Sequence, residues 1–221
     1  MAFAGPKSSF SNGARLCLNA LLALCLLAPG SARAAELLDD AALLAALRQG
    51  GHNIYFRHVA TDWSLSDDVR QADDLRSCDA ARMRQLSDAG RADAIAIGEA
   101  MRRLRIPVSE VKASPYCRTV ETARLMQLGE VIESDEVMNL RAASYVGGRG
   151  RVVETAQQLL ASEPPGGGNR VIVAHGNVAR EATPYYPGEG EALVFEPEKG
   201  VGFILRGRIP VNDWQRLMAG E

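Results

Sequence analysis

Apolar residues along the chain alternate between two periodicities, one typical of helices and one typical of buried strands. Leu43, Leu44 and Leu47 recur at helical spacing near the start of this pattern. Gly50 favours the end of that helix, and residues 54–56 then form a short apolar, β-prone run. A helix followed directly by a short buried strand is therefore the first structural unit that the sequence predicts.

The same alternation continues to the end of the chain. Helices are predicted where the apolar spacing is amphipathic, at residues 88–104, 118–128 and 152–160. Strands are predicted at residues 108–113, 131–132 and 171–174, a late hairpin at residues 192–195 and 201–205, and a polar loop at residues 61–78. Alternating helices and strands, with strands buried on both faces, predict a three-layer α/β/α sandwich with a mostly parallel central sheet.

Residues 1–34 have the composition of a secretory signal peptide. Two basic residues precede an apolar run over residues 16–28, and an Ala-Arg-Ala sequence ends at Ala34, where we predict cleavage. A membrane anchor is the alternative, but these 13 mostly apolar residues are too few for a bilayer core that needs about 20. We therefore expect a single domain over residues 35–221, in a periplasmic or secreted protein without a stable membrane anchor.

Composition narrows the class of protein further. The full chain is 47% apolar and 24% charged, with a net charge of −2. These values exclude a disordered chain and a nucleic-acid binder that acts by bulk electrostatics. Without residues 1–34, 22 basic residues face 27 acidic ones, which gives a net charge of −5. We expect no nucleic-acid partner.

Four cysteines are too few for a disulfide scaffold, and two of them lie in the predicted signal peptide. The remaining pair, Cys78 and Cys117, would form one intramolecular disulfide in an oxidising compartment or stay as two separate buried thiols. In the chain-entropy model a bridge would stabilise the fold by about 4 kcal/mol. The sequence leaves both states open.

Candidate chemistry lies where the predicted strands end. One strand ends in Arg57 and His58, another ends in His175, and a third is followed by Arg118 at the start of a helix. Ligands bind at the carboxyl ends of strands in open α/β sheets, so neighbouring strands would bring these residues to one crevice. Arginine forks and helix N-termini suit phosphate oxygens, and imidazole can attack phosphorus. Each residue alone fits a structural role, but the joint arrangement favours a phosphate-handling site.

Four segments resemble, in order, the motifs of the histidine phosphatase superfamily, which includes the phosphoglycerate mutase-like proteins. They read YFRHVATDWS at residues 55–64, LSDAGRADAIAIGEAMRRL at 86–104, VKASPYCRTVETA at 111–123 and VIVAHGN at 171–177. The resemblance covers roughly residues 51–180. Together with the signal peptide, it implies an exported bacterial branch of that superfamily.

The resemblance implies a role for each of four residues. His58 would be the nucleophile that accepts the phosphoryl group on a ring nitrogen, and Arg57 and Arg118 would bind the phosphoryl oxygens. His175 would hydrogen-bond the same oxygens as a cation or a donor. This chemistry implies no cofactor and no metal, and neither histidine has a second His or Cys at ligand spacing.

The general acid that would protonate the leaving group is not identified by the resemblance. Neither residues 137–148 nor the segment after His175 carries the acidic motif of a known branch. A separate departure is Val59, which stands where the family has glycine after Arg-His. We name Asp62 as the first candidate for the acid and Glu136 as the second.

Other residues carry lesser expectations. Glu121, three positions after Arg118, is predicted to orient that arginine or to cap the helix. Trp63 and the loop over residues 61–78 are predicted to contribute to substrate selection. His52 precedes its strand, away from the catalytic end, and is assigned no role.

Together these patterns predict an exported phosphatase that acts on a phosphomonoester or related phosphate through a phosphohistidine on His58. The partner would be a phosphorylated small molecule or a cell-envelope glycan. Two alternatives stay open. One is a non-catalytic phosphate-binding envelope protein of the same fold, and the other is a phosphohistidine or sugar-phosphate phosphatase without a dedicated general acid.

Overall fold

A single mixed sheet forms the centre of the computed structural model, which describes residues 37–219. Its strands are β1 (Asn53–Arg57), β2 (Val108–Ala113), β3 (Val131–Glu133), β4 (Asn169–Ala174), β5 (Ala192–Glu198) and β6 (Gly202–Ile209). Their order across the sheet is β3-β2-β4-β1-β5-β6. The strands from β3 to β1 pair in parallel, whereas β5 and β6 add an antiparallel hairpin at one edge. The predicted mostly parallel sheet is therefore confirmed.

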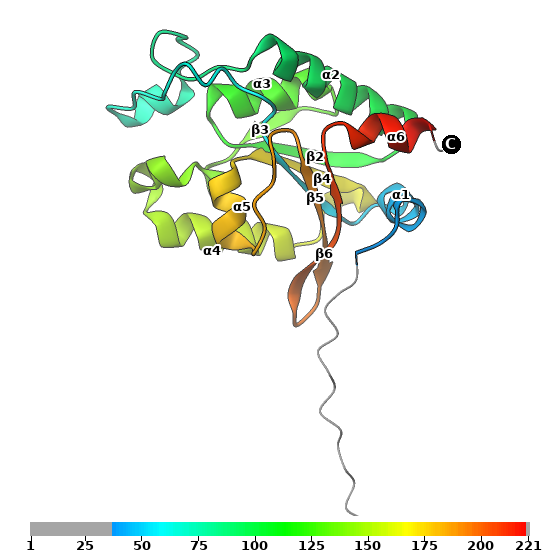
Figure 1. Ribbon diagram of the computed structural model, residues 1–221. Helices are drawn as coiled ribbons and strands as arrows, with labels where there is room; N and C mark the ends of the chain where they lie inside the picture. Colours follow the sequence, from blue (N-terminus) through cyan, green and yellow to red (C-terminus); the bar gives the residue numbers. More distant parts are fainter. Residues whose placement is uncertain (1–36, 220–221) are drawn as a thin grey trace, which may run out of the picture. The chain divides into compact units, whose positions relative to one another are not determined.

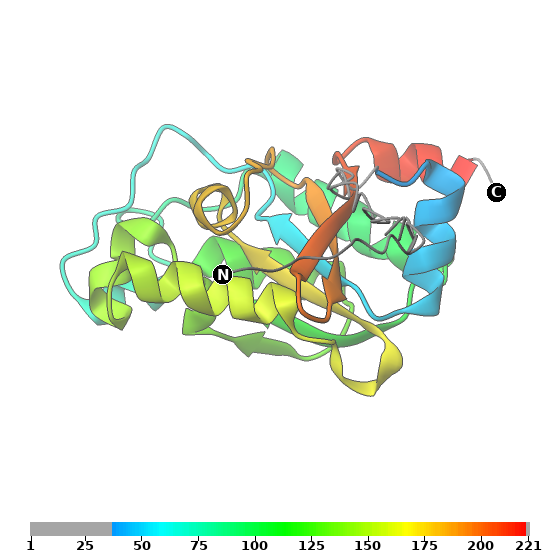
Figure 2. The same ribbon diagram turned by 90° about the horizontal axis from the view of Figure 1, so that it is seen from below.

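Helices cover both faces of this sheet (Figures 1 and 2). The α-helices are α1 (Asp40–Gln49), α2 (Asp88–Arg103), α3 (Cys117–Met126), α4 (Arg149–Ala161), α5 (Gly176–Ala182) and α6 (Asp213–Ala219). The short 3-10 helices are η1 (Ala72–Arg76), η2 (Asp135–Val137), η3 (Leu140–Val146) and η4 (Pro165–Gly167). Helices α1, α2, α3 and α6 share one hydrophobic core with the sheet, and α4 and α5 share the other.

The central strands supply side chains to both cores. Ile54 and Phe56 of β1 point into the core under α1, α2, α3 and α6, whereas Tyr55 belongs to the core under α4 and α5. Every residue of β1 and β4 is buried. Burial on both faces explains why these strands are continuous apolar runs in the sequence. The predicted three-layer sandwich is confirmed.

Local signals in the sequence set the starts of two helices. The side chain of Asp39 accepts a hydrogen bond from the amide of Ala42 at 2.8 Å, at the start of α1. Ser87 does the same for the amide of Gly90 at 3.0 Å, at the start of α2. Each bond satisfies an amide that has no partner within its helix, and α2 begins at Asp88, where the sequence predicts.

Helices α2 and α3 approach each other closely at Gly98. A Cβ atom at this position would lie 1.9 Å from the carbonyl oxygen of Met126, at the end of α3. Only glycine fits such a contact without movement of one helix. The contact fixes the spacing between α2 and the end of α3, the helix that also carries Arg118.

The structure adds short helices that the periodicity did not predict. Helix α5 begins directly after His175 and has seven residues, as does α6 near the end of the described chain. Helix η1 interrupts the predicted loop over residues 61–78. Seven residues make about two turns, which is too short for a helical period to be recognised.

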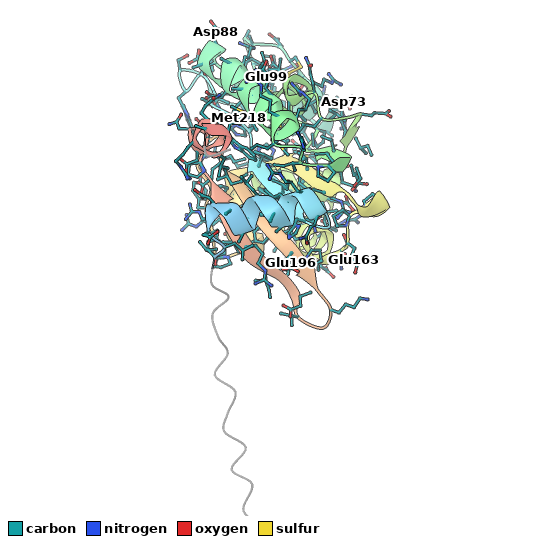
Figure 3. All side chains as sticks on the ribbon, turned by 90° about the vertical axis from the view of Figure 1, so that its right-hand side faces the viewer. Asp73, Asp88, Glu99, Glu163, Glu196 and Met218 are labelled. Atoms are coloured by element: carbon teal, nitrogen blue, oxygen red, sulfur yellow. A yellow bond between two sulfur atoms is a disulfide. The ribbon has the colours of Figure 1, made fainter. Side chains whose placement is uncertain are left out.

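Charged side chains lie on the outer surfaces of the helices. Figure 3 shows Asp88 and Glu99 of α2 and Glu163 beyond α4, all of them exposed. The described residues belong to one compact unit, and no helix among residues 37–219 is long and apolar enough to cross a membrane. The predicted signal peptide and its cleavage site after Ala34 lie outside the described residues.

Candidate active site

Three neighbouring strands, β2, β4 and β1, end side by side at one edge of the sheet. The amide of His58, just after β1, donates to the carbonyl of Ala174 at the end of β4, at 3.0 Å. The amide of Ser114, just after β2, donates to the carbonyl of Val173 at 3.0 Å. His175 follows β4 directly. Sheet pairing therefore brings the residues that follow the three strands to one place.

A cavity of about 150 Å³ lies at these strand ends. Its lining residues are Arg57, His58, Trp63, Asp67, Arg84, Arg118, Asn139, Arg141, His175, Gly176, Asn177 and Tyr186. The four candidate residues named from the sequence are all among them. Because drug-sized ligands occupy pockets of about 300 Å³ or more, this cavity suits a small anion or the end of a larger molecule.

The His58 ring is buried and oriented by its own backbone. Its Nδ1 lies 2.9 Å from the carbonyl oxygen of Val59. Because a carbonyl only accepts hydrogen bonds, Nδ1 carries the proton and Nε2 keeps its lone pair. Burial, together with the charges of Arg118 and Arg57, holds the pKa of His58 well below its usual range. The ring is therefore neutral at neutral pH, which is the form that a nucleophile needs.

The His175 ring lies beside His58, with the two ring centroids 5.7 Å apart. Its backbone is held by Tyr55, whose hydroxyl donates to the His175 carbonyl at 2.8 Å and accepts from the His175 amide at 3.2 Å. Nε2 lies 2.9 Å from the hydroxyl oxygen of Ser114, and Nδ1 is buried without a partner among the described residues.

Burial and the charge of Arg118 also hold the pKa of His175 well below its usual range. The sequence left open whether His175 acts as a cation or as a neutral donor, and the low pKa favours the neutral donor. When the Ser114 hydroxyl donates to Nε2, the proton of the neutral ring is on Nδ1, and Nδ1 is then a free hydrogen-bond donor.

Arg118 is almost fully buried, with 1% of its surface exposed. Its guanidinium lies 4.5 Å from the centre of the Tyr116 ring, and Nη1 donates to Oδ1 of Asp67 at 3.0 Å. Nε is buried and has no partner among the described residues. A guanidinium has five donors, so one carboxylate oxygen satisfies only part of it.

Arg57 is the last residue of β1 and also lines the cavity. Its Nη2 donates to Oε1 of Glu189 at 3.3 Å, and its Nη1 donates to the carbonyl of Pro187 at 3.3 Å. The guanidinium also lies 5.4 Å from the centre of the Tyr186 ring. These contacts hold the arginine at the cavity, which Arg118 also lines.

Several lining residues were not predicted from the sequence. The Arg84 guanidinium lies 3.9 Å from the centre of the Trp63 ring, and burial together with the charge of Arg118 lowers its pKa. Asn177 donates to Oδ1 of Asn139 at 2.9 Å. Asn177 is the last residue of the VIVAHGN motif, which was a usable signal, whereas Arg84 lies outside any periodic segment.

The structure contradicts both sequence candidates for the general acid. Asp62 is exposed and caps the amide of Ser64 at 2.9 Å. Glu136 is bound by Lys112 at 2.5 Å. Neither carboxylate lines the cavity. The two predictions rested on distance along the chain, which does not determine where a loop side chain points.

The side chains of Glu121 and His52 both have partners outside the cavity. Glu121 accepts from Nε of Arg91 on α2 at 2.7 Å, so the predicted contact with Arg118 is wrong. The carboxylate of Asp67 takes that place. His52 binds the carbonyl of Gly50 through Nδ1 at 2.9 Å, away from the cavity, as expected of a residue without a role.

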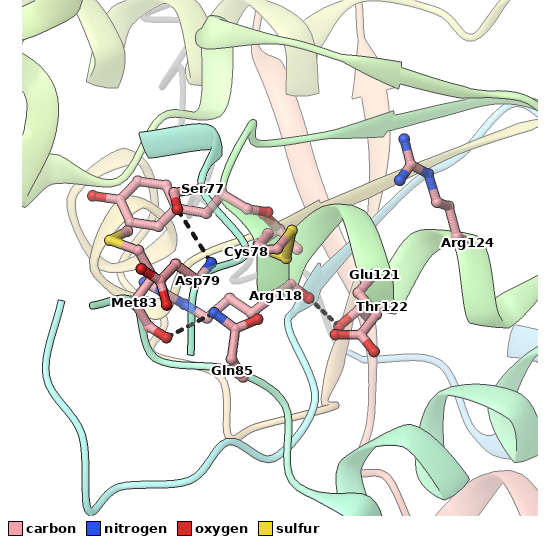
Figure 4. Close-up of a disulfide and its surroundings, with 12 residues drawn as sticks. Ser77, Cys78, Asp79, Met83, Gln85, Arg118, Glu121, Thr122 and Arg124 are labelled. Atoms are coloured by element: carbon pink, nitrogen blue, oxygen red, sulfur yellow. Dashed lines mark hydrogen bonds between the residues drawn. A yellow bond between two sulfur atoms is a disulfide. The ribbon is translucent and has the colours of Figure 1, made fainter. Parts of the chain in front are cut away.

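A disulfide joins Cys78 to Cys117, with their Cα atoms 5.3 Å apart (Figure 4). It ties the end of the loop that follows His58 to the first residue of α3. Arg118 is the next residue, and Figure 4 shows it beside the bridge. The bridge therefore holds the segment that carries Asp67 and Arg84 to the helix that carries Arg118.

The cavity as a whole has an excess of hydrogen-bond donors. Four arginines and one carboxylate line it. Nε of Arg84, Nε of Arg118 and Nδ1 of His175 are buried without partners among the described residues. Each unsatisfied buried donor costs about 1–3 kcal/mol, and a tetrahedral oxyanion would supply the acceptors and the negative charge that they lack. Among the described residues, no group of three or more His, Cys, Asp or Glu side chains is placed to hold a metal ion.

Comparison with known proteins agrees with this arrangement. The family model of the histidine phosphatase superfamily (branch 1) matches residues 54–146. No curated protein matches the chain. The solved structure of the protein histidine phosphatase SixA complexed with tungstate is 13% identical, with a TM-score of 0.53 over 73% of this chain and 98% of that one.

Two further solved structures are similar. One is the putative phosphohistidine phosphatase SixA from Agrobacterium tumefaciens, with 19% identity and a TM-score of 0.47 over 72% of this chain and 97% of that one. The other is a phosphoserine phosphatase from Entamoeba histolytica in complex with 3-phosphoglyceric acid, with 14% identity and a TM-score of 0.49 over 71% of this chain and 95% of that one. Residues 54–146, which include His58 and Arg118, thus match the histidine phosphatase superfamily, and the chain shares its fold with the tungstate complex.

Proposed function

We propose that the protein is a metal-independent phosphatase that hydrolyses a phosphomonoester through a phosphohistidine on His58. One observation carries this proposal: a neutral histidine with a free Nε2 lone pair lies in a cavity that is otherwise rich in unsatisfied donors. The match of residues 54–146 to the histidine phosphatase superfamily supports the same chemistry. We further propose that the protein is exported, on the basis of the signal peptide predicted over residues 1–34.

In the first step, Nε2 of His58 attacks phosphorus as the bond to the leaving oxygen breaks. The guanidinium groups of Arg57 and Arg118 and the Nδ1 proton of His175 bind the phosphoryl oxygens, where negative charge develops. In the second step, water attacks the phosphohistidine and releases inorganic phosphate. The burial that keeps His58 neutral thus supports the attack in the first step and the departure of the ring in the second.

Cavity size and its exposed rim bear on the class of substrate. The cavity accommodates a phosphoryl group, and the rings of Trp63 and Tyr186 at its edge are 65% and 53% exposed. The remainder of the substrate would then lie outside the cavity, against these two rings. We propose a phosphorylated small molecule or a terminal phosphate of a cell-envelope glycan as the substrate.

The test is hydrolysis of para-nitrophenyl phosphate by the purified protein in the presence of a metal chelator. His58→Ala should abolish turnover, whereas the matched variant His52→Ala, which removes a buried histidine outside the cavity, should retain it per folded molecule. Phosphate trapped on the wild-type protein should be stable to alkali and labile to acid. Turnover that survives in His58→Ala would reject the mechanism, and phosphate binding without turnover would favour a non-catalytic binder.

A further inference from the structure

We infer that Asp67 is the general acid that protonates the leaving group, an assignment that rests on the proposed function. Asp67 lies in the loop between β1 and η1. Among the described residues that line the cavity, it is the only one with an acidic side chain. A histidine nucleophile that displaces an alkoxide needs such a group, because an unprotonated alkoxide is a poor leaving group.

Hydrogen bonds orient this carboxyl group through one of its oxygens. Oδ1 accepts from the amide of Arg84 at 3.0 Å and from Nη1 of Arg118 at 3.0 Å. Oδ2 accepts no hydrogen bond from the described residues. The side chain is 14% exposed. Asp67 is therefore fixed in place and keeps one oxygen free to carry a proton.

Glu189, which contacts the lining residues Arg57 and Trp63, is engaged on both of its carboxylate oxygens. Oε1 of Glu189 accepts from Arg57 at 3.3 Å and from Thr61 at 3.1 Å, and Oε2 lies 3.4 Å from Nε1 of Trp63. Glu189 does not line the cavity. Its contacts hold the Arg57 side chain and the Trp63 ring, which is a positioning role.

Arg118 links the carboxyl group to the substrate. Its Nη1 binds Asp67 while its Nε has no partner, so a phosphoryl group that takes the free donors of Arg118 lies next to Asp67.

Both steps balance with this assignment. In the first, the Nε2–P bond forms, the P–O bond breaks, and its electron pair goes to the leaving oxygen, which takes the proton from Asp67. In the second, water attacks phosphorus and gives a proton to the Asp67 carboxylate, while the electron pair of the N–P bond returns to Nε2 of His58. The products are the alcohol and inorganic phosphate, and Asp67 is again protonated.

The test compares substrates that differ in how much their leaving group needs a proton. Asp67→Asn keeps an amide oxygen that still accepts from Arg84 and Arg118, so it removes the proton and retains the geometry. Its kcat on glycerol 2-phosphate should fall by about 10²–10³-fold. On para-nitrophenyl phosphate, whose phenolate leaves without a proton, its kcat should fall by less than about tenfold.

The matched control is Asp68→Asn, the neighbouring aspartate, which pairs with Arg70 at the surface and does not line the cavity. It should match the wild type on both substrates. An equal loss on both substrates in Asp67→Asn would show that Asp67 only positions Arg118, and no loss on either would also overturn the assignment. If His58→Ala turned over substrate as fast as the wild type, the proposed function would be rejected, and the assignment of Asp67 as the acid would be rejected with it.

Discussion

Two buried arginines at opposite ends of the same sheet have opposite surroundings. Arg170, at the start of β4, is 6% exposed and forms an ion pair with Glu110. It also donates to Oδ1 of Asn53 at 2.8 Å and to the hydroxyl of Ser162 at 2.9 Å, and three backbone carbonyls complete its contacts. Arg118, beyond the carboxyl end of β2, is 1% exposed; it donates a hydrogen bond to the Asp67 carboxylate and has an unpartnered Nε.

In the proposed function, this difference separates a structural arginine from one that binds a ligand. Arg170 has its donors satisfied by the protein, so it adds to stability and leaves nothing to bind. Arg118 keeps a donor free at a cost to the fold, because a buried polar group without a partner is destabilising. Burial alone therefore says little about the role of a charged residue, whereas the count of its satisfied donors says much.

The largest effect should come from Arg118→Ala. Loss of its donors to the phosphoryl oxygens should lower kcat/KM by about 10³-fold, equivalent to about 4 kcal/mol. The free energy of unfolding should change by less than about 1 kcal/mol, because the removed group was only partly satisfied. Steady-state kinetics and denaturant unfolding measure the two quantities. A large loss of stability would mean that Arg118 is structural in the way that Arg170 is.

Arg170→Ala should give the reverse pattern. Removing it leaves Glu110 without its cation and several carbonyls without donors, so the free energy of unfolding should fall by about 3 kcal/mol. This is the lower end of the range for buried pairs, because Glu110 can still reach water. The kcat of the folded fraction should match the wild type. A specific loss of activity in the folded protein would contradict the comparison.

Anion binding should stabilise the fold through the cavity alone. Orthovanadate at 100 times its dissociation constant should raise the free energy of unfolding by about 2.7 kcal/mol. The stabilisation should be lost in Arg118→Ala and kept in Arg170→Ala, which a thermal-shift titration of the three proteins can measure. Equal stabilisation of all three would place the anion outside the cavity.

The smallest effect concerns pH. Burial holds the pKa values of His58 and His175 below their usual range, so below about pH 6.5 the folded protein binds fewer protons than the unfolded chain. Stability is therefore lost as the pH falls through 6.5, by up to about 1.4 kcal/mol per pH unit for each histidine. His58→Ala should have a shallower pH dependence between pH 5 and 7. If the free energy of unfolding changed with pH by the same slope in the wild type and in His58→Ala, the pKa of His58 would not be lowered by folding.

The sequence predicts the fold, and it predicts that the four candidate residues lie together, because their signals are local. His58 and His175 directly follow apolar strands, and Arg118 opens a helix, so strand order alone brings them together. The edge hairpin is also local, since its two strands are consecutive in the chain.

Residues held by contacts between distant segments could not be predicted in this way. Asp67 meets Arg118 across 51 positions of the chain, and it lies in a loop without periodicity. Glu121 has the right spacing for Arg118, yet its carboxylate turns to Arg91 on the neighbouring helix. Loop conformation and helix packing decide both contacts, and neither is encoded by a spacing rule.

The close contact at Gly98 has a consequence for the evolution of this protein. Any larger residue there would push against Met126 and move α3, and the guanidinium at the other end of that helix would move with it. A survey of random substitutions would therefore rank Gly98 beside the histidines, although it has no side chain to take part in the chemistry. In this domain, tolerance to substitution therefore depends on the helix that carries a reactive group as well as on the reactive group itself.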